Sequence, residues 1–166
     1  RYNPYGGAER FVERALLALA GQGADITLIT RNWEGAPRAD FHQVTCDPPY
    51  SRLFGGRTAR DRTFAAAVQA EMTRGAYDIV QSHERVPGCT IFRAGDGVHA
   101  AWLDHRRRGL APRSRLAEQW SPYHRYILQA ERAMLRHPQL RAVICNSHMV
   151  ADEMARLTGI SRYDAI

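Results

Sequence analysis

Short β-branched, apolar runs alternate along this chain with longer stretches in which apolar residues recur every three or four positions. The runs are typical of buried strands, and the longer spacing is typical of amphipathic helices. The pattern predicts strands at about 25–30, 41–45, 77–81, 90–93 and 141–145. It predicts helices at about 8–20, 59–74, 98–108 and 114–136, and a last helix that ends near residue 157.

Glycine, proline and small polar residues mark the ends of several predicted elements. Gly21 and Gly23 are suited to end the first helix, because glycine adopts the left-handed conformation found at helix C-termini. Pro112 is expected to separate the helices at 98–108 and 114–136. Asn146 or Ser147 is expected to cap the last helix.

Alternation of strands and helices predicts the fold class. Such a pattern builds right-handed βαβ units, and so an α/β, Rossmann-like parallel sheet with helices on both faces. The chain has 166 residues, of which 45% are apolar, enough for one domain with a buried core. Ligands of these sheets bind at the carboxyl ends of the strands, so candidate residues are sought there.

The composition limits the nucleophiles and the binding partners that this chain can have. The net charge is +6, and every one of the 23 basic residues is arginine. Arginine forks suit phosphates and carboxylates, while the absence of lysine excludes a lysine nucleophile or Schiff base. A basic balance fits phosphorylated partners, an anionic membrane face or nucleic acid. No zinc-finger spacing or RNA-binding aromatic run is present, so nucleic acid is not predicted as a partner.

The cysteine spacing indicates neither a disulfide framework nor a zinc site, and the hydropathy indicates no membrane span. Cys46, Cys89 and Cys145 stand far apart, which disfavours a disulfide framework or a zinc knuckle and favours buried thiols in a reducing cytoplasm. No apolar run approaches the roughly 18 residues of a membrane span.

The first candidate site is the glycine pair before the first helix. Gly6 and Gly7 let the backbone approach a ligand, and the helix that follows presents free N–H groups to an anion. Glu9 is the nearest carboxylate. An ordinary tight turn explains the same residues equally well, and the segment departs from G-x-G-x-x-G.

The second and third candidates follow predicted strands. Asp96 lies between two glycines after the strand at 90–93, where a carboxylate can accept a proton from a hydroxyl nucleophile. His99 shares its face if a helix begins there, although Asp96 could equally be that helix's N-cap. His83 and Arg85 follow the strand at 77–81 and could reach a sugar hydroxyl or a phosphate, or belong to a plain surface loop.

A basic and aromatic stretch makes the fourth candidate. Arginine beside tryptophan suits an anionic lipid surface, and a solvated helix face is the alternative. The candidate membrane-contact residues are Trp102, Arg106, Arg107, Arg108, Arg113 and Arg115.

Several catalytic motifs are absent from the sequence. It has no Asp-x-Asp dyad, HExxH or P-loop, and its seven histidines do not pair at metal-ligand spacing. The sequence therefore predicts no bound metal.

Taken in order, four segments resemble the family 4 retaining glycosyltransferases, which have two Rossmann-like domains (GT-B type). They are residues 3–11, residues 23–30, the spacing from 86–88 to Asp96, and residues 142–147. The lipopolysaccharide-core α-glucosyltransferases look most similar, through residues 33–35 and the spacing to Asp96.

The resemblance implies that residues 1–166 form the N-terminal, acceptor-side domain. A first strand would precede Arg1, and a donor domain with a Glu-x7-Glu motif would follow Ile166. Gly6 and Gly7 would line the diphosphate and reacting sugar, and Asp96 would touch the acceptor hydroxyl or the transferred sugar. The family works without a metal. The implied partners are a nucleotide diphosphate sugar, UDP-glucose by expectation, and a glycan or lipopolysaccharide-core acceptor. The implied location is the cytoplasm, with peripheral contact at the inner face of the cytoplasmic membrane.

Some positions depart from the family pattern. An acidic residue is expected four positions after the second glycine, where this chain has Phe11, and Glu9 cannot inherit that role by alignment. Two other classes therefore stay open. One is a nicotinamide-binding dehydrogenase half, for which Asp25 is in range but Arg10 occupies the third glycine position. The other is a module that binds glycan without catalysis.

Overall fold

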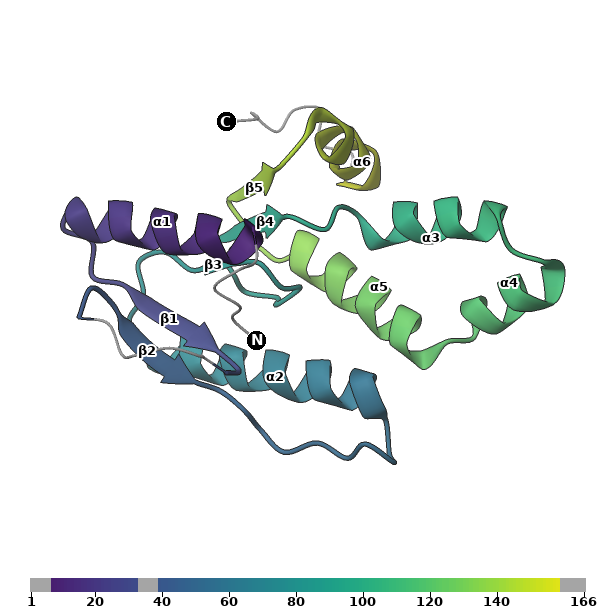
Figure 1. The fold of residues 1–166 in the computed structure, drawn as a ribbon, viewed down its shortest axis with the longest axis horizontal. Helices are drawn as coiled ribbons and strands as arrows, with labels where there is room; N and C mark the ends of the chain where they lie inside the picture. Colours follow the sequence, from purple (N-terminus) through teal and green to yellow (C-terminus); the bar gives the residue numbers. More distant parts are fainter. Residues whose placement is uncertain (1–6, 33–38, 159–166) are drawn as a thin grey trace.

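The computed structural model describes residues 7–32 and 39–158, in which helices and short parallel strands alternate (Figure 1). Its first half contains α1 (Gly7–Gly21), β1 (Thr27–Thr30), β2 (His42–Thr45), α2 (Gly56–Arg74), β3 (Gln81–Ser82) and β4 (Ile91–Ala94). Its second half contains α3 (His99–Arg108), α4 (Pro112–Gln119), α5 (Pro122–Leu135), β5 (Ala142–Cys145) and α6 (His148–Thr158).

The strands form two sheets in which every pairing is parallel. β1 pairs with β2, and β4 lies between β3 and β5, with Phe92 opposite Val143. None of the described strands joins β1 to β3. The parallel α/β architecture confirms the predicted fold class.

The hydrophobic core surrounds the three-stranded sheet. Phe92 and Ala94 alternate with half-buried residues on β4, and Val143 and Cys145 do the same on β5, so one face of each strand is buried. Helices α5 and α6 cover this region with Met134 and Met154. The core cluster comprises Cys89, Phe92, Ala94, Val98, Met134, Val143, Cys145, Val150 and Met154. Two of the three cysteines are therefore buried, as predicted, and burial raises the pKa of Cys89 to about 11.

Helix α2 connects the two sheets, and Arg31 fixes it against the first. From the end of β1, Arg31 donates 2.6 Å hydrogen bonds to Asp47 Oδ1 and to the carbonyl oxygen of Arg60 on α2. Its guanidinium also lies 5.1 Å from the Phe64 ring centroid. At its other end, α2 reaches the loop after β3, and it also contacts α5.

The predicted helix at 114–136 is two helices, α4 and α5, with a break at Ser121. Pro122 lacks an N–H and disfavours a helical conformation at the residue before it. Ser121 accordingly has extended backbone, and its hydroxyl accepts a hydrogen bond from the His124 N–H. Pro112 lies at the predicted break between helices: α3 ends at Arg108, and Pro112 is the first residue of α4, a position that proline tolerates.

The predicted strand at 77–81 is reduced to β3. The Val80 N–H donates a hydrogen bond to the Thr90 hydroxyl oxygen at 3.2 Å, so a side chain takes the place of a backbone acceptor. At the last helix, Ser147 is the cap and accepts from the Val150 N–H, whereas Asn146 bonds elsewhere. Within the described residues no helix is both long enough and apolar enough to cross a membrane.

Candidate functional site

Three parallel strands end beside the loop that carries Asp96, and residues from the two outer strands hold that loop. From the end of β5, Asn146 Nδ2 donates to the Gly95 carbonyl at 2.9 Å. From the segment after β3, Arg85 Nη2 donates to the Gly97 carbonyl at 3.1 Å. Gly97 has φ +72°, a conformation that favours glycine. Asp96 is thus exposed on a loop whose flanking residues are both fixed.

A buried carboxylate on α5 also holds the loop that carries Asp96. Glu131 is 1% exposed, and its Oε1 accepts from Arg85 Nε and from the His99 N–H, each at 3.0 Å. The N-cap residue of α3 is Val98, which has no side chain able to cap. Glu131 therefore satisfies the start of α3 from another helix, and the alternative in which Asp96 caps α3 is wrong.

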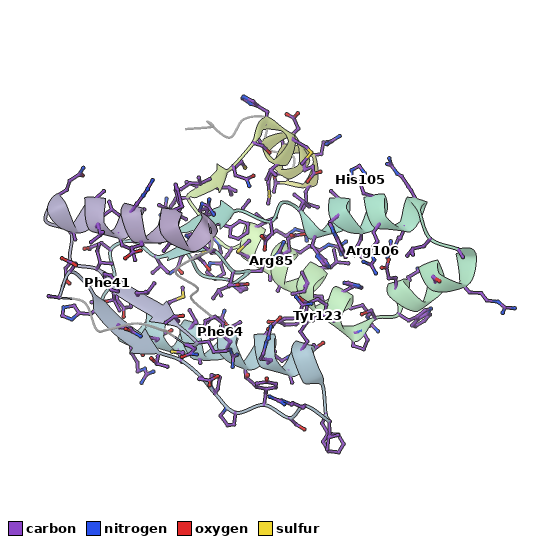
Figure 2. All side chains as sticks on the ribbon, in the orientation of Figure 1. Phe41, Phe64, Arg85, His105, Arg106 and Tyr123 are labelled. Atoms are coloured by element: carbon purple, nitrogen blue, oxygen red, sulfur yellow. The ribbon has the colours of Figure 1, made fainter. Side chains whose placement is uncertain are left out.

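An open cleft of about 570 Å³ lies between α2, α3 and α5 at the carboxyl ends of β3, β4 and β5. In Figure 2 the side chains of Arg85, Arg106 and Tyr123 lie around this region. The cleft is lined by Arg57, Arg85, Asp96, His99, Trp102, Arg106, Tyr123, His124 and Ile127. Asp96 is the one carboxylate among these lining residues, so the cleft is basic apart from a single acceptor group.

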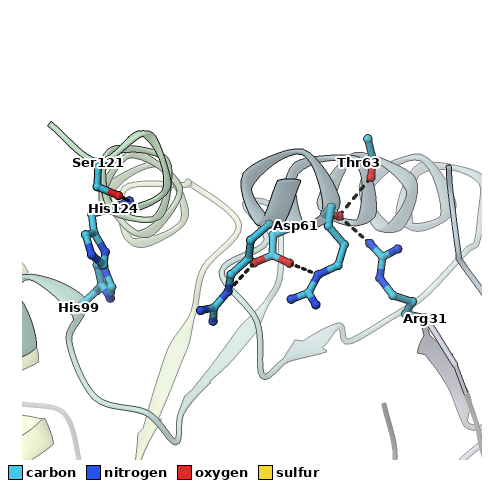
Figure 3. Close-up of polar contacts among 8 residues, drawn as sticks. Arg31, Asp61, Thr63, His99, Ser121 and His124 are labelled. Carbon is cyan, nitrogen blue, oxygen red and sulfur yellow. Dashed lines mark hydrogen bonds and ion pairs between the residues drawn. The ribbon is translucent and has the colours of Figure 1, made fainter. Parts of the chain in front are cut away.

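Two histidines and a tryptophan form one wall of the cleft. His99 Nε2 lies 3.1 Å from His124 Nδ1, and the two rings lie side by side (Figure 3). The Trp102 ring stacks on His99 with centroids 5.4 Å apart. One imidazole must donate and the other accept, so the pair requires at least one neutral ring.

Burial and neighbouring arginines lower the pKa of both imidazoles. Burial, with Arg85 as the second cause, lowers the pKa of His99 from 6.5 to about 4, although Glu131 opposes the shift. Burial also lowers the pKa of His124, although Glu118 opposes the shift and arginines add smaller contributions to it. Near neutral pH, His99 thus offers the cleft a neutral hydrogen-bonding ring rather than a cation.

The predicted site residues are partly brought together. Asp96, His99 and Arg85 line one cleft, whereas His83 forms a 3.0 Å contact with Gln81 outside this lining. Gly6 lies outside the described residues. Gly7 begins α1, and Glu9 lies in its first turn with a side chain outside the described part.

The stretch predicted to contact a membrane divides between two environments. Trp102 and Arg106 line the cleft, with the Arg106 guanidinium 5.2 Å from the Trp102 ring and ion-paired to Glu118. Of the other predicted membrane-contact residues, Arg107 and Arg108 lie on α3 and Arg113 lies on α4. Arg115 also lies on α4, but its side chain is outside the described part of the structure.

Sequence reasoning missed four residues of the site: Arg57, Tyr123, His124 and Glu131. Arg57 and Tyr123 meet only because α2 packs against α5, and no local pattern records that contact. Glu131 did leave a signal. It lies four residues after Ile127 and three before Met134, both buried, so it is a lone charge on an apolar helix face.

No group of three His, Cys, Asp or Glu side chains suited to a metal ion occurs within residues 7–32 and 39–158. The absence of a metal from the reaction stays a prediction.

Comparison with known proteins places this architecture in a family. A model described as Glycosyltransferase Family 4 matches residues 5–165. The lipopolysaccharide glucosyltransferase WaaG of Escherichia coli (strain K12) is 28% identical over 100 residues, 60% of this chain and 26% of that protein. The crystal structure of WaaG, a glycosyltransferase involved in lipopolysaccharide biosynthesis, superposes with a TM-score of 0.75 at 20% identity, over 99% of this chain and 40% of that one.

The fold is thus that of a GT-B glycosyltransferase domain. The chain belongs to glycosyltransferase family 4. It spans well under two thirds of the relatives it matches. Family membership favours a transferase over the nicotinamide-binding dehydrogenase half.

Replacing Glu131 with glutamine should destabilise the protein strongly, because the Arg85 charge would remain buried without its counter-ion. Breaking such a buried pair typically costs about 3–5 kcal/mol. The free energy of unfolding from urea titration measures the loss. The matched control is Glu71→Gln, which breaks the more exposed pair with Arg74 and should cost about 1 kcal/mol or less. Equal losses in the two variants would contradict the assigned role of Glu131.

The stability of the protein should fall as the pH is lowered from about 6.5 to about 4. In this window the unfolded chain binds a proton at His99 that the folded protein does not, because the pKa is lowered on folding. His99→Gln should flatten the pH dependence of the unfolding free energy. His148→Gln, at an exposed residue of α6, is the control and should retain the wild-type slope. A wild-type slope in His99→Gln would contradict this expectation.

Proposed function

We propose that this chain is the acceptor-side half of a retaining glycosyltransferase. The enzyme would move a hexose, glucose by expectation, from a nucleotide diphosphate sugar such as UDP-glucose to a glycan or glycolipid in lipopolysaccharide or cell-envelope biosynthesis. The observation that carries the proposal is the exposed Asp96 carboxylate, held at the ends of three parallel strands in a basic cleft. The similarity to WaaG supports the type of acceptor.

Asp96 would act on the acceptor hydroxyl. In the proposed reaction the acceptor oxygen forms a bond to the anomeric carbon, and the bond from that carbon to the nucleotide diphosphate breaks with its electron pair on the diphosphate. Asp96 accepts a hydrogen bond from the hydroxyl and takes up or directs its proton. Neutral His99, three residues away, hydrogen-bonds a neighbouring hydroxyl and so orients the acceptor.

The start of α1 would act on the donor. This helix begins at Gly7, and its first N–H groups have no acceptor within the helix itself. These groups and the helix dipole would stabilise charge on the leaving diphosphate without a metal. A second, donor-binding domain would close over the cleft and exclude water, which favours transfer over hydrolysis.

We further propose that the enzyme works in the cytoplasm and contacts the inner face of the cytoplasmic membrane through α3 and α4. Trp120 at the end of α4 is 69% exposed, and Arg113 and Arg125 are exposed on either side of it in sequence. An exposed tryptophan among arginines is suited to the interface of an anionic leaflet.

Replacing Asp96 with asparagine in a full-length protein carrying this chain should reduce kcat about 100-fold or more, the range expected for loss of a general base. Acceptor-stimulated release of nucleotide diphosphate measures turnover across a panel of donors. The matched control is Asp104→Asn on α3, which removes the same charge outside the cleft lining and should retain wild-type kcat. Wild-type turnover in Asp96→Asn would refute the assigned role.

Exchange of Arg106, Arg107 and Arg108 for glutamine should weaken binding to vesicles that contain anionic lipid. Each arginine contributes about 1 kcal/mol near such a surface, so the partition coefficient should fall about 100-fold at low salt. Co-sedimentation with liposomes measures this partition. A control triple variant exchanges three exposed arginines of α5 and the following segment: Arg132, Arg136 and Arg141. Equal losses in both variants, or equal wild-type binding to neutral vesicles, would contradict a specific membrane surface on α3 and α4.

A further inference from the structure

A second cleft of about 530 Å³ adjoins the one that contains Asp96. It lies between the first turns of α2 and the start of α5, and Arg57 and Tyr123 line both clefts. Its lining consists of Phe54, Gly55, Arg57, Thr58, Ala59, Arg62, Ser121, Pro122 and Tyr123. The shared pair makes the two clefts neighbours, so a molecule longer than one sugar could occupy both.

Arg57 forms the boundary between the two clefts. Its guanidinium carbon lies 4.3 Å from the centroid of the Tyr123 ring, which holds the side chain across the α2–α5 contact. The side chain remains 66% exposed. Its ion pair with Asp61 is long, at 4.0 Å, because the other oxygen of Asp61 bonds Arg60 at 2.9 Å (Figure 3). One carboxylate thus serves two arginines, and positive charge is left over beside the cleft.

The second cleft is positively charged and partly aromatic. Arg57 and Arg62 are its two charged lining residues, with no carboxylate in the lining to balance them. The N-terminal end of the α2 dipole is also positive, and no acidic residue in the first turn of α2 offsets it. The positive charge of Arg57 also acts in the first cleft. It contributes, less than burial does, to the lowered pKa values of His99 and His124.

We infer that this second cleft is an extension subsite for the acceptor, and that it binds a phosphate or carboxylate carried by the sugar unit next to the reacting one. The inference rests on the proposed function. Planar guanidinium groups recognise both anions by paired hydrogen bonds. Phe54, Pro122 and Tyr123 offer apolar surface to the carbon face of a sugar ring.

The position of the cleft favours a glycan over a membrane lipid as its occupant. It is concave and shares a wall with the cleft that contains Asp96, so a chain bound at Asp96 can continue into it. A glycan whose reacting hydroxyl lies at Asp96 would extend past Arg57 into the second cleft. The enzyme would therefore discriminate among acceptors by a negative charge on the sugar unit next to the one that reacts.

The test uses a full-length protein carrying this chain and three acceptors of one sugar sequence: neutral, phosphorylated, and with a uronic acid at the adjacent unit. Arg57→Gln should raise KM about tenfold for the anionic acceptor that the wild type prefers, the loss expected for one charge-assisted contact. KM for the neutral acceptor should change much less than KM for the anionic acceptor, because only the anionic acceptor loses a charge-assisted contact. Preference for the phosphorylated or the uronic acceptor identifies the anion.

Two control variants complete the design. Arg57→Lys keeps the charge, so its KM for the anionic acceptor should lie between those of the wild type and Arg57→Gln. A misfolded cleft would not show this partial recovery. Arg74→Gln removes a charge from the other end of α2, outside both clefts, and should behave as wild type.

Two outcomes overturn the inference while the proposed function stands. One is equal KM changes for neutral and anionic acceptors in Arg57→Gln. The other is unchanged KM with loss of binding to anionic vesicles, which would assign Arg57 to a lipid surface. Absence of transfer by the wild type to any acceptor from any nucleotide sugar overturns both the function and the inference.

Discussion

The buried carboxylate of Glu131 is the contact on which the candidate site depends. A carboxylate that is 1% exposed is tolerated only with strong donors, and here Arg85 and the His99 N–H supply them from two different strand ends. Arg85 in turn bonds the Gly97 carbonyl beside Asp96. The position of α5 is thereby linked, through two hydrogen bonds, to the position of the proposed reactive carboxylate.

This network makes a cleft rich in arginine compatible with the neutral hydroxyl groups of the proposed acceptor. Arg85 is occupied by Glu131 and Gly97, and Arg106 by Glu118, so much of their hydrogen-bonding capacity is already used. The same charges, added to burial, lower the pKa of His99 and of its partner His124. The cleft thus combines one exposed carboxylate with the neutral imidazole of His99, a set suited to sugar hydroxyls. Arg57, whose ion pair with Asp61 is long, would remain available to the proposed anion.

Local sequence patterns predicted the parallel α/β class and the strand-end position of Asp96, because both follow from periodicity and glycine placement. They failed where a side chain replaced a backbone partner. The Thr90 hydroxyl shortened β3, and the Ser121 hydroxyl together with Pro122 divided one predicted helix into α4 and α5. Residues that meet only through packing, such as Arg57 and Tyr123, leave no such pattern. Glu131 was detectable in principle, as a charge on the apolar face of α5.

Helix α2 makes the first sheet relevant to the cleft. Arg31, which follows β1, fixes the N-terminal part of α2 through the Arg60 carbonyl, and Asp61, the next residue, divides its charge between Arg60 and Arg57. Arg57 lies one turn earlier and faces Tyr123 on α5. Because helices transmit displacement as nearly rigid rods, movement of the β1–β2 sheet would shift Arg57 relative to Asp96. The position of Arg57, which forms the boundary between the two clefts, therefore depends on Arg31, which lies outside both. In the proposed reaction, the packing of α2 would set the spacing between the acceptor hydroxyl and the anion in the second cleft.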